Sequence, residues 1–421
     1  MHDTSVQRPP GQRPPAQHPS AQHPSGQRPS VGLVILLGAL TAFGAVSIDL
    51  YLPAIPTIAR HFGAPVAAAQ ITMSAFFLGM AVGQLGFGPL SDRVGRKPPL
   101  IAGAAIYTLA SLALMLAPSI ELMAAGRFVQ AVGACAGVVI ARAVVRDRFD
   151  TTESARLFSL MFLVLGVAPM LAPTLGAILL EHFGWQSIFL VLAVFGLVSG
   201  VAVLFGLTES RSAATATQAA SESTLQSYRA AIANRQVLGF VLAGALNGAA
   251  LFTYIAASPA LFMDYHGQSP AAFGWIFAVN AAGLVIATQL NRAALKNASP
   301  ARIARIAILA ALGFSLLLLL LSVAGLASMP ITIALLFFAL GSFGFVGGNS
   351  SALALGAMPV RAGAISALIG AGSFAAGAAA SALTAPFAAQ GPTAMAAGMA
   401  AGFAGSAIAL IHVARIGRWT D

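Results

Sequence analysis

The chain has 421 residues, of which 58% are hydrophobic and only 8% are charged, whereas soluble domains carry roughly 25% charged residues. So few charges cannot cover a water-facing surface, and the mean hydropathy of +0.85 agrees. The composition excludes a soluble enzyme, a disordered chain and, despite a net charge of +10, a nucleic-acid-binding domain. It indicates a polytopic membrane protein.

Residues 7–31 form a five-residue repeat: QRPPG, QRPPA, QHPSA, QHPSG and QRPSV. Proline in every copy fixes φ and removes a backbone donor, which predicts a disordered, solvated tail over residues 1–31. The tail lacks the apolar core of a signal peptide.

Twelve apolar stretches of about 20 residues or more follow, each long enough to cross a bilayer as a helix. We expect them at 32–55, 70–90, 99–117, 121–145, 157–180, 187–207, 237–262, 271–290, 303–326, 330–351, 363–387 and 393–413. The short alternating segments of a β-barrel are not seen in the sequence.

A polar stretch over 208–236 divides these spans six and six. The predicted fold is all-α and integral to the membrane, with bundles at 32–207 and 237–413, a cytoplasmic linker at 208–236 and a tail at 414–421. Equal six-span halves with a hydrophilic linker are typical of the major facilitator architecture. If the N-terminal tail is cytoplasmic, 20 of the 22 Lys and Arg residues lie on the cytoplasmic side. Because basic loops stay inside, both termini are expected in the cytoplasm.

The break after the second span reads GPLSDRVGRKPPL from Gly88 to Leu100. Taken alone, it would serve as a basic anchoring loop. Its pattern, however, resembles the cytoplasmic signature of major facilitator transporters, G-x-x-x-D-R-x-G-R-K/R. The residues that match, and that we expect to control conformation, are Gly88, Asp92, Arg93, Gly95, Arg96 and Lys97. Gly88 allows close helix approach, and Gly95 allows a tight turn with positive φ. The resemblance implies that Asp92 engages the start of the eleventh span near Gly363.

Asp49 in the first span and Arg127 in the fourth are the only charges well inside any predicted span. A buried ion costs several kcal/mol unless it is paired or faces water, so both are functional candidates. Both are expected between the midplane and the outer surface, where they could pair across a shared cavity. A static ion pair that only fixes helix packing is the alternative.

The fifth predicted span contains Pro169, Pro173 and Gly176, which predict a kink. The segment resembles the antiporter signature of the same superfamily, G-P-x-x-G-G, with Ala172 and Ala177 in place of glycines. Kinks are common in membrane helices, so an ordinary bend is the alternative.

Three motifs together narrow the resemblance: D-x-Y-L-P-x-x-P from Asp49, the segment from Arg127 to Asp147, and A-P-x-x-A-P-x-x-G around Pro169. From about residue 32 to 413 the chain resembles bicyclomycin-resistance (Bcr/CflA) type multidrug exporters, which implies a drug:proton antiporter of the bacterial inner membrane. Gln186 departs from the pattern, because the family usually has arginine there.

The expected function is export of small lipophilic compounds in exchange for protons, by alternating access. Asp49 is expected to carry the proton and Arg127 to tune it. Candidate cavity residues, each of which could instead bond helix to helix, are Tyr51, Gln130, Asn247, Tyr254 and Asn349.

Export of a metabolite such as an amino acid, and proton-coupled uptake, are the alternatives within transport. An intramembrane enzyme is disfavoured, because no histidine lies deep in a predicted span and no His-Glu-x-x-His motif occurs. We expect no cofactor, no metal and no nucleic-acid partner, and a protein that functions as a monomer.

Overall fold

A computed structural model of the chain describes residues 30–211, 217 and 223–415, and within these residues the structure is helical without strands. Twelve segments of the described chain are long and apolar enough to cross a membrane. The predicted all-α class with twelve spans is therefore confirmed. Most of the predicted N-terminal tail, residues 1–29, lies outside the described residues.

The first half of the chain forms six spans, the first of which continues through a short turn into a second helix. Its elements are α1 (Val31–Asp49), η1 (Leu52–Ala54), α2 (Ile55–His61), α3 (Val66–Val94), α4 (Lys97–Leu114), α5 (Ile120–Arg148), α6 (Thr151–Phe183) and α7 (Gln186–Gly206).

The second half begins after a short helix, α9 (Thr224–Ala233), which lies within the stretch expected to be the linker. Its elements are α10 (Arg235–Pro259), η2 (Ala260–Tyr265), α11 (Pro270–Ala294), α12 (Pro300–Val323), α13 (Met329–Ala357), η3 (Pro359–Arg361), α14 (Ala362–Thr384), η4 (Ala385–Gln390), α15 (Pro392–Ile408) and η5 (Ala409–Val413).

Every predicted span coincides with an observed one, and the ends agree to within six residues. The observed spans are mostly longer, as where the second runs over Val66–Val94 instead of 70–90. Helices continue past the hydrocarbon core, and their polar last turns carry no hydropathy signal.

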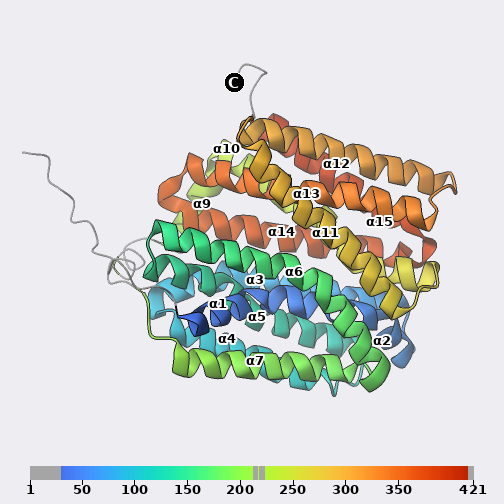
Figure 1. Cartoon of the computed structure of the whole chain (residues 1–421), viewed down its shortest axis with the longest axis horizontal. Coiled ribbons are helices and arrows are strands. Elements are labelled where there is room, and N and C mark those ends of the chain that lie inside the picture. Colours follow the sequence, from blue (N-terminus) through green and yellow to red (C-terminus); the bar gives the residue numbers. More distant parts are fainter. Residues whose placement is uncertain (1–29, 212–216, 218–222, 416–421) are drawn as a thin grey trace, which may run out of the picture.

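The packing of the helices repeats when each helix is advanced by six spans. The α3–α5 pair of the first half corresponds to α11–α13 of the second, and α1–α6 corresponds to α10–α14. Likewise α4 packs on α5 and α7, as α12 packs on α13 and α15. The halves meet through α3 with α14 and through α6 with α11, which the same exchange relates. Figure 1 shows the blue-to-green helices on one side and the yellow-to-red helices on the other.

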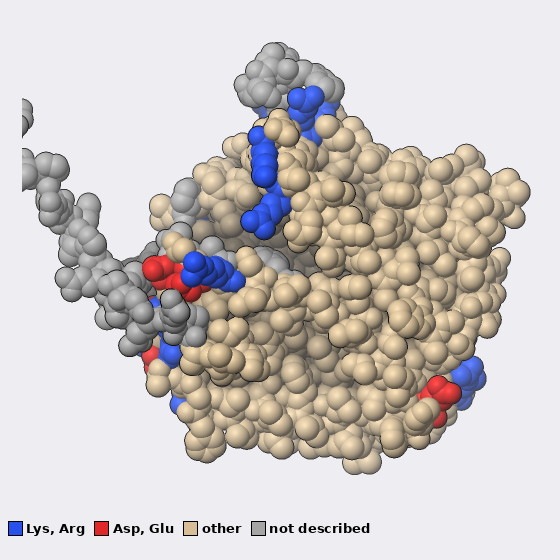
Figure 2. All heavy atoms as spheres, viewed as in Figure 1, with Lys and Arg blue, Asp and Glu red and all other residues tan. Residues whose placement is uncertain are grey.

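The two ends of the bundle differ in charge. We call the end that carries the α3–α4 turn and α9 the basic end, and the end that carries α2 and η2 the opposite end. In Figure 2 charged side chains lie near the ends, while the long flank between them is uncharged. An uncharged flank is what a lipid-facing surface requires.

Close helix approach in the first half depends on two glycines of α3. A Cβ on Gly79 would lie 2.3 Å from the Phe128 carbonyl oxygen of α5, and one on Gly83 would lie 2.6 Å from Cβ of Cys135. Small residues four positions apart let two membrane helices pack with their backbones in contact. Such close packing matters in a membrane because the hydrophobic effect does not drive helices together in lipid. Cys135, the only cysteine of the chain, is fully buried at this contact.

Candidate functional site

Asp49 is the last residue of α1 and lies at a break in the first span. Pro53, four residues on, has no N–H to give to the Asp49 carbonyl, so the helix cannot continue. The Asp49 side chain is 3% exposed. Within the described residues its carboxylate has neither a hydrogen bond nor an ion pair.

Arg127 of α5 is fully buried in the first half. Its guanidinium donates to Oε1 of Gln130 (2.6 Å) and to the Ser47 carbonyl (3.1 Å). It also lies over the rings of Tyr51 and Phe76, 4.4 and 4.2 Å from their centroids. Cation–π contacts of a desolvated guanidinium contribute about 2 kcal/mol each.

The expected pairing of Asp49 with Arg127 is wrong for this conformation. Arg127 faces the rings and amides of its own half, while Asp49, the last residue of α1, has no bonded partner among the described residues. Two predicted cavity residues share the surroundings of Arg127: Gln130 accepts from it and donates to Ser111 Oγ (2.7 Å), and the Tyr51 hydroxyl bonds to Thr72 Oγ1 (2.7 Å). Both therefore bond helix to helix, the alternative noted for them.

The proline-containing helix α6 packs directly against the Asp49 break. Pro169 and Pro173 both lie inside this helix. A Cβ on Gly176 would lie 2.2 Å from the Leu50 carbonyl oxygen, so only glycine fits here without displacement. Two residues earlier, Thr174 lies against Gly274 of α11, in the second half, where an added Cβ would be 2.9 Å from Thr174 Oγ1. The segment from Pro173 to Gly176 thus lies between the Leu50 carbonyl, next to Asp49, and the other half.

The second-half candidates are all buried. Tyr254 of α10 accepts a hydrogen bond from Asn280 Nδ2 of α11 (3.1 Å) and stacks on Phe277. Asn349 donates to Asn291 Oδ1 (2.8 Å). Asn247 is fully buried, and both polar atoms of its amide lack a hydrogen-bond partner among the described residues.

At the basic end, Arg96 joins three side chains of the first half. Its guanidinium bonds to Asp92 (2.5 Å), to Asp147 at the end of α5 (2.7 Å) and to Ser91 Oγ (2.8 Å). Burial acts to lower the pKa of Arg96, but the hydrogen bonds and charges of Asp147 and Asp92 outweigh it and raise the pKa. The network ties α3, α4 and α5 together.

The turn between α3 and α4 confirms the expectation for Gly95, which has φ +102°. Glu209, after α7, accepts the backbone N–H groups of Arg96 (2.8 Å) and Lys97 (3.2 Å). Arg211 donates to the carbonyls of Asp92 and Arg93. The residues after α7 therefore hold the motif in place, a role that the sequence pattern alone did not reveal.

A cavity of about 620 Å³ lies at the basic end, between the halves. Gly88, Asp92, Arg93 and Arg96 line it from the first half, whereas the five predicted cavity residues do not. A Cβ on Gly88 would lie 3.9 Å from Cγ1 of Val139, an ordinary contact, so Gly88 is not the close-approach glycine that its place in the motif suggests.

Asp92 was expected to engage the start of the eleventh span near Gly363. Instead it bonds to Arg96, and Gly363 lines the same cavity from α14. The contact is absent here because the halves are apart at this end.

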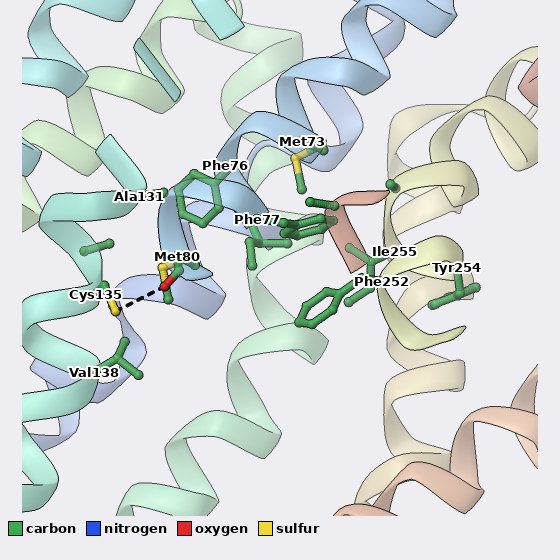
Figure 3. Packing of buried hydrophobic residues seen from close by; sticks show 14 of the residues in the cluster. Met73, Phe76, Phe77, Met80, Ala131, Cys135, Val138, Phe252, Tyr254 and Ile255 are labelled. Atoms are coloured by element: carbon green, nitrogen blue, oxygen red, sulfur yellow. Dashed lines mark hydrogen bonds between the residues drawn. The ribbon is translucent and has the colours of Figure 1, made fainter. Parts of the chain in front are cut away.

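The opposite end is closed by contacts between α3 and α14. Ser74 Oγ donates to Ser381 Oγ (2.9 Å), and Gln70 donates to the Ser381 carbonyl (3.4 Å). Phe77 of α3 and Phe252 of α10 point toward one another, as Figure 3 shows, with ring centroids 4.6 Å apart. At this end Asp264 of η2 also interacts electrostatically with Arg60 of α2.

This fold is matched by a known family: the one described as Major Facilitator Superfamily matches residues 35–382. The chain belongs to the major facilitator superfamily. It is therefore a transporter, as predicted, and not an enzyme.

Several curated bacterial proteins are similar in sequence. The chain is 29% identical to "Bicyclomycin resistance protein homolog" of Haemophilus influenzae, over 81% of this chain and 86% of the relative. It is 34% identical to "Uncharacterized MFS-type transporter YdgK" of Bacillus subtilis, over 61% and 64%, and 35% identical to "Multidrug resistance protein MdtL" of Shigella dysenteriae, over 58% and 61%. The last two matches span less than two thirds of those relatives. The resemblance to bicyclomycin-resistance proteins is confirmed, and the chain is a multi-pass protein of the bacterial inner membrane.

Solved structures share the fold. A D-xylose-proton symporter aligns with TM-score 0.69 at 16% identity, covering 91% of this chain and 97% of that one. A bacterial homologue of the human lysosomal transporter Spinster, in an inward-facing unoccupied conformation, aligns with TM-score 0.63 at 15% identity, covering 91% and 95%. At this identity the likeness concerns the fold alone.

Proposed function

We propose that this superfamily member exports small amphipathic compounds in exchange for protons, by alternating access. In this proposal the basic end faces the cytoplasm, and a single chain is the working unit because it contains both halves and the cavity between them. The multidrug and bicyclomycin resistance named for its relatives supports the substrate class.

The observation that carries the proposal is Asp49, a buried acid that lacks a partner and sits where both halves meet. The turn η1 just after Asp49 packs on α6 of its own half and on α10 and α11 of the other. An ion at such a site is unfavourable unless something compensates for its lost hydration. Movement between the halves changes these surroundings, so the proton occupancy of Asp49 and the conformation of the protein become linked.

In this proposal the two ends of the bundle open and close in turn. In the described conformation the cavity opens toward the basic end, while α3 and α14 are in contact toward the opposite end. Closing the basic end would carry Asp92 across the cavity toward Gly363. There the first backbone N–H groups of α14 would donate hydrogen bonds to the Asp92 carboxylate, as helix N-termini do for anions.

The cavity ends near an aromatic surface. Gln84 of α3 lines it, and Phe77 lies two turns deeper on the same face of that helix. Phe77 packs with Phe252 and Phe374, whose centroids lie 4.6 and 6.3 Å from its own. Separation of α3 from α14 would expose these rings beside polar amides, a surface suited to lipophilic compounds that carry a few polar groups.

The test is export by the Asp49→Asn variant in a pump-deficient host, against a drug panel, followed by transport in proteoliposomes with a proton gradient. We expect this variant to lose uphill export and drug-driven proton release. Asp264→Asn and Glu121→Gln, which change acids near the span ends, are the matched controls and should retain export. Arg127→Lys should retain part of it, since lysine keeps the charge but loses the planar fork that bonds Gln130 and Ser47. Uphill export with intact proton exchange in Asp49→Asn would refute the assignment.

A further inference from the structure

The cavity at the basic end carries more positive than negative charge. Five arginines and two aspartates line it, a net charge of +3: Arg93, Arg96, Arg142, Arg146 and Arg361, with Asp92 and Asp147. Both aspartates bond to Arg96, at 2.5 and 2.7 Å. The acids of the cavity wall therefore leave the charges of Arg93, Arg142 and Arg146 uncompensated.

These three arginines have guanidinium N–H groups that are available to a ligand. Arg142 uses only Nε, which donates to the Val138 carbonyl one turn back on α5 (3.2 Å). Among the described residues, the guanidinium groups of Arg93 and Arg146 have no bonded partner. All three residues are exposed, and all three line the cavity.

The positions of Arg142 and Arg146 are unfavourable without a bound anion. The two residues lie four positions apart on α5, so their side chains emerge from one face of the helix, where like charges repel. Apolar groups that cannot solvate them line the same cavity, among them Val139 and Phe158. Topology explains why arginines lie near the cytoplasm, but it does not require them to face a cavity between the halves.

The size and the lining of the cavity favour an amphipathic ligand. Its volume of about 620 Å³ is that of sites for drug-sized molecules. Gln84 of α3 lines it, and the aromatic surface at Phe77 lies two turns deeper on that helix. A ligand with one anionic group and an apolar body would place the anion at the arginines and the body toward the aromatic rings.

We propose that this cavity selects anionic amphipathic compounds, with a carboxylate, sulfonate or phosphate group on an apolar body, through Arg93, Arg142 and Arg146. The inference rests on the proposed function, in which the cavity receives the exported compound from the cytoplasm. Guanidinium groups bond such anions with two parallel N–H groups, and a charged cleft with low-dielectric walls concentrates ions of the opposite sign. Neutral compounds are accepted less well, and the same charges repel cationic ones.

Export of an anion also makes full use of the driving forces. A proton that enters and an anion that leaves both make the cell interior more positive. A membrane potential that is negative inside therefore drives both movements. If a cation left in one-for-one exchange with a proton, no net charge would move, and only the pH gradient would drive export.

Three probes that share one fluorophore and differ in charge test the selection without any gradient. They are dansylglycine (anionic), dansylamide (neutral) and dansylcadaverine (cationic). Each is titrated into the purified full-length protein in an uncharged detergent while the dansyl fluorescence is followed. We expect dansylglycine to bind most tightly and dansylcadaverine most weakly. Added salt should weaken the binding of dansylglycine and leave that of dansylamide unchanged, because salt screens charges.

Loss of charge from the cavity wall should remove the preference. Arg142→Gln combined with Arg146→Gln should weaken dansylglycine binding about tenfold, as expected for lost hydrogen bonds to a charged group, and change dansylamide binding less than twofold. Lysine at both positions keeps the charge and should retain most of the preference. The matched control is Arg292→Gln, since Arg292 is an exposed arginine in the last turn of α11 that does not line the cavity. It should change neither affinity.

Four results would overturn the inference. One is equal affinity for dansylglycine and dansylamide in the parent protein. Another is an equal loss in Arg292→Gln, which would assign the preference to the general charge of the surface. A third is an equal loss of all three probes in the glutamine pair, which would mean that the arginines support the cavity without selecting charge. The last is displacement of dansylglycine by short-chain phosphatidylglycerol, but not by phosphatidylcholine, at concentrations below those at which dansylglycine binds, which would assign the cavity to a lipid headgroup.

Failure of the proposed function has a different signature. If Asp49→Asn still exports uphill with intact proton exchange, the proposed coupling fails, whatever the three probes show in binding. If Asp49→Asn abolishes export while dansylglycine and dansylamide bind equally, the proposed function stands and only the substrate class is lost.

Discussion

Gly176→Ala should destabilise the junction between α6 and the end of α1. The added Cβ would lie 2.2 Å from the Leu50 carbonyl oxygen and 3.0 Å from Cγ of Pro53. An ordinary contact needs about 3.5 Å, so α6 and the Leu50–Tyr51 peptide must separate by roughly 1 Å. Because the atom displaced is backbone, no side-chain rotation relieves the clash. Overpacking of this kind costs about 1–3 kcal/mol.

The matched control is Gly313→Ala on α12, where no atom lies within 4 Å of the added Cβ. Alanine favours helix by up to about 1 kcal/mol over glycine, so this control should be neutral or slightly stabilising. Cys135 provides the assay, since it is the only cysteine and is fully buried, and a thiol-reactive dye reports its exposure on heating. Gly176→Ala should react at lower temperature than Gly313→Ala and export at least several-fold less. Equal melting and export in the two variants would refute the packing argument.

Three other predictions concern the basic end. Burial raises the pKa of Glu209, but hydrogen bonds from four backbone N–H groups outweigh burial and lower the pKa below the usual 4.5. The stabilisation by the ionised carboxylate is therefore present above pH 4.5 and is lost as the pH falls through the lowered pKa. Glu209→Gln should melt at a lower temperature than the parent at pH 7, and the difference in melting temperature should disappear in acid. Asp92→Asn should slow turnover while substrate affinity, measured by equilibrium binding, changes less than threefold, or about 0.7 kcal/mol; a large affinity loss at normal turnover would contradict this. Reporters fused between Arg211 and Ser223, or after Arg418, should read cytoplasmic, and an external signal at either site would reverse the assigned orientation.

The spans could be predicted because the hydropathy of consecutive residues adds up along the chain. Twenty consecutive apolar residues identify a membrane helix whatever they contact, and proline and glycine at its ends mark the breaks. Asp49 and Arg127 could be singled out for the same reason, since a charge in a long apolar stretch is visible without knowing the fold. The positive φ of Gly95 likewise follows from local sequence.

The hydrogen-bond and packing partners of these residues could not be predicted, because they depend on where each side chain points in the folded chain. Asp49 and Arg127 lie on spans that pack together, yet Asp49 has no bonded partner among the described residues and Arg127 lies over the rings of Tyr51 and Phe76. The role of Glu209 depends on a chain reversal that returns it to residues more than 100 positions earlier. Gly79 and Gly83 are two among 43 glycines, and only the position of α5 distinguishes them.

In the proposed mechanism, the interactions within each half persist during transport, whereas those between the halves at one end must break. Within the first half, the ion pairs of Arg96 and the backbone contacts of Gly79 and Gly83 hold helices that move together. Between the halves at the opposite end, the bonds made by Ser381 are neutral, and such bonds contribute only about 0.5–1.5 kcal/mol each. Aromatic rings meeting there can slide apart without leaving a buried charge unpaired. A closed end built this way can open at modest cost, and in the proposed mechanism the proton occupancy of Asp49 shifts the balance between conformations.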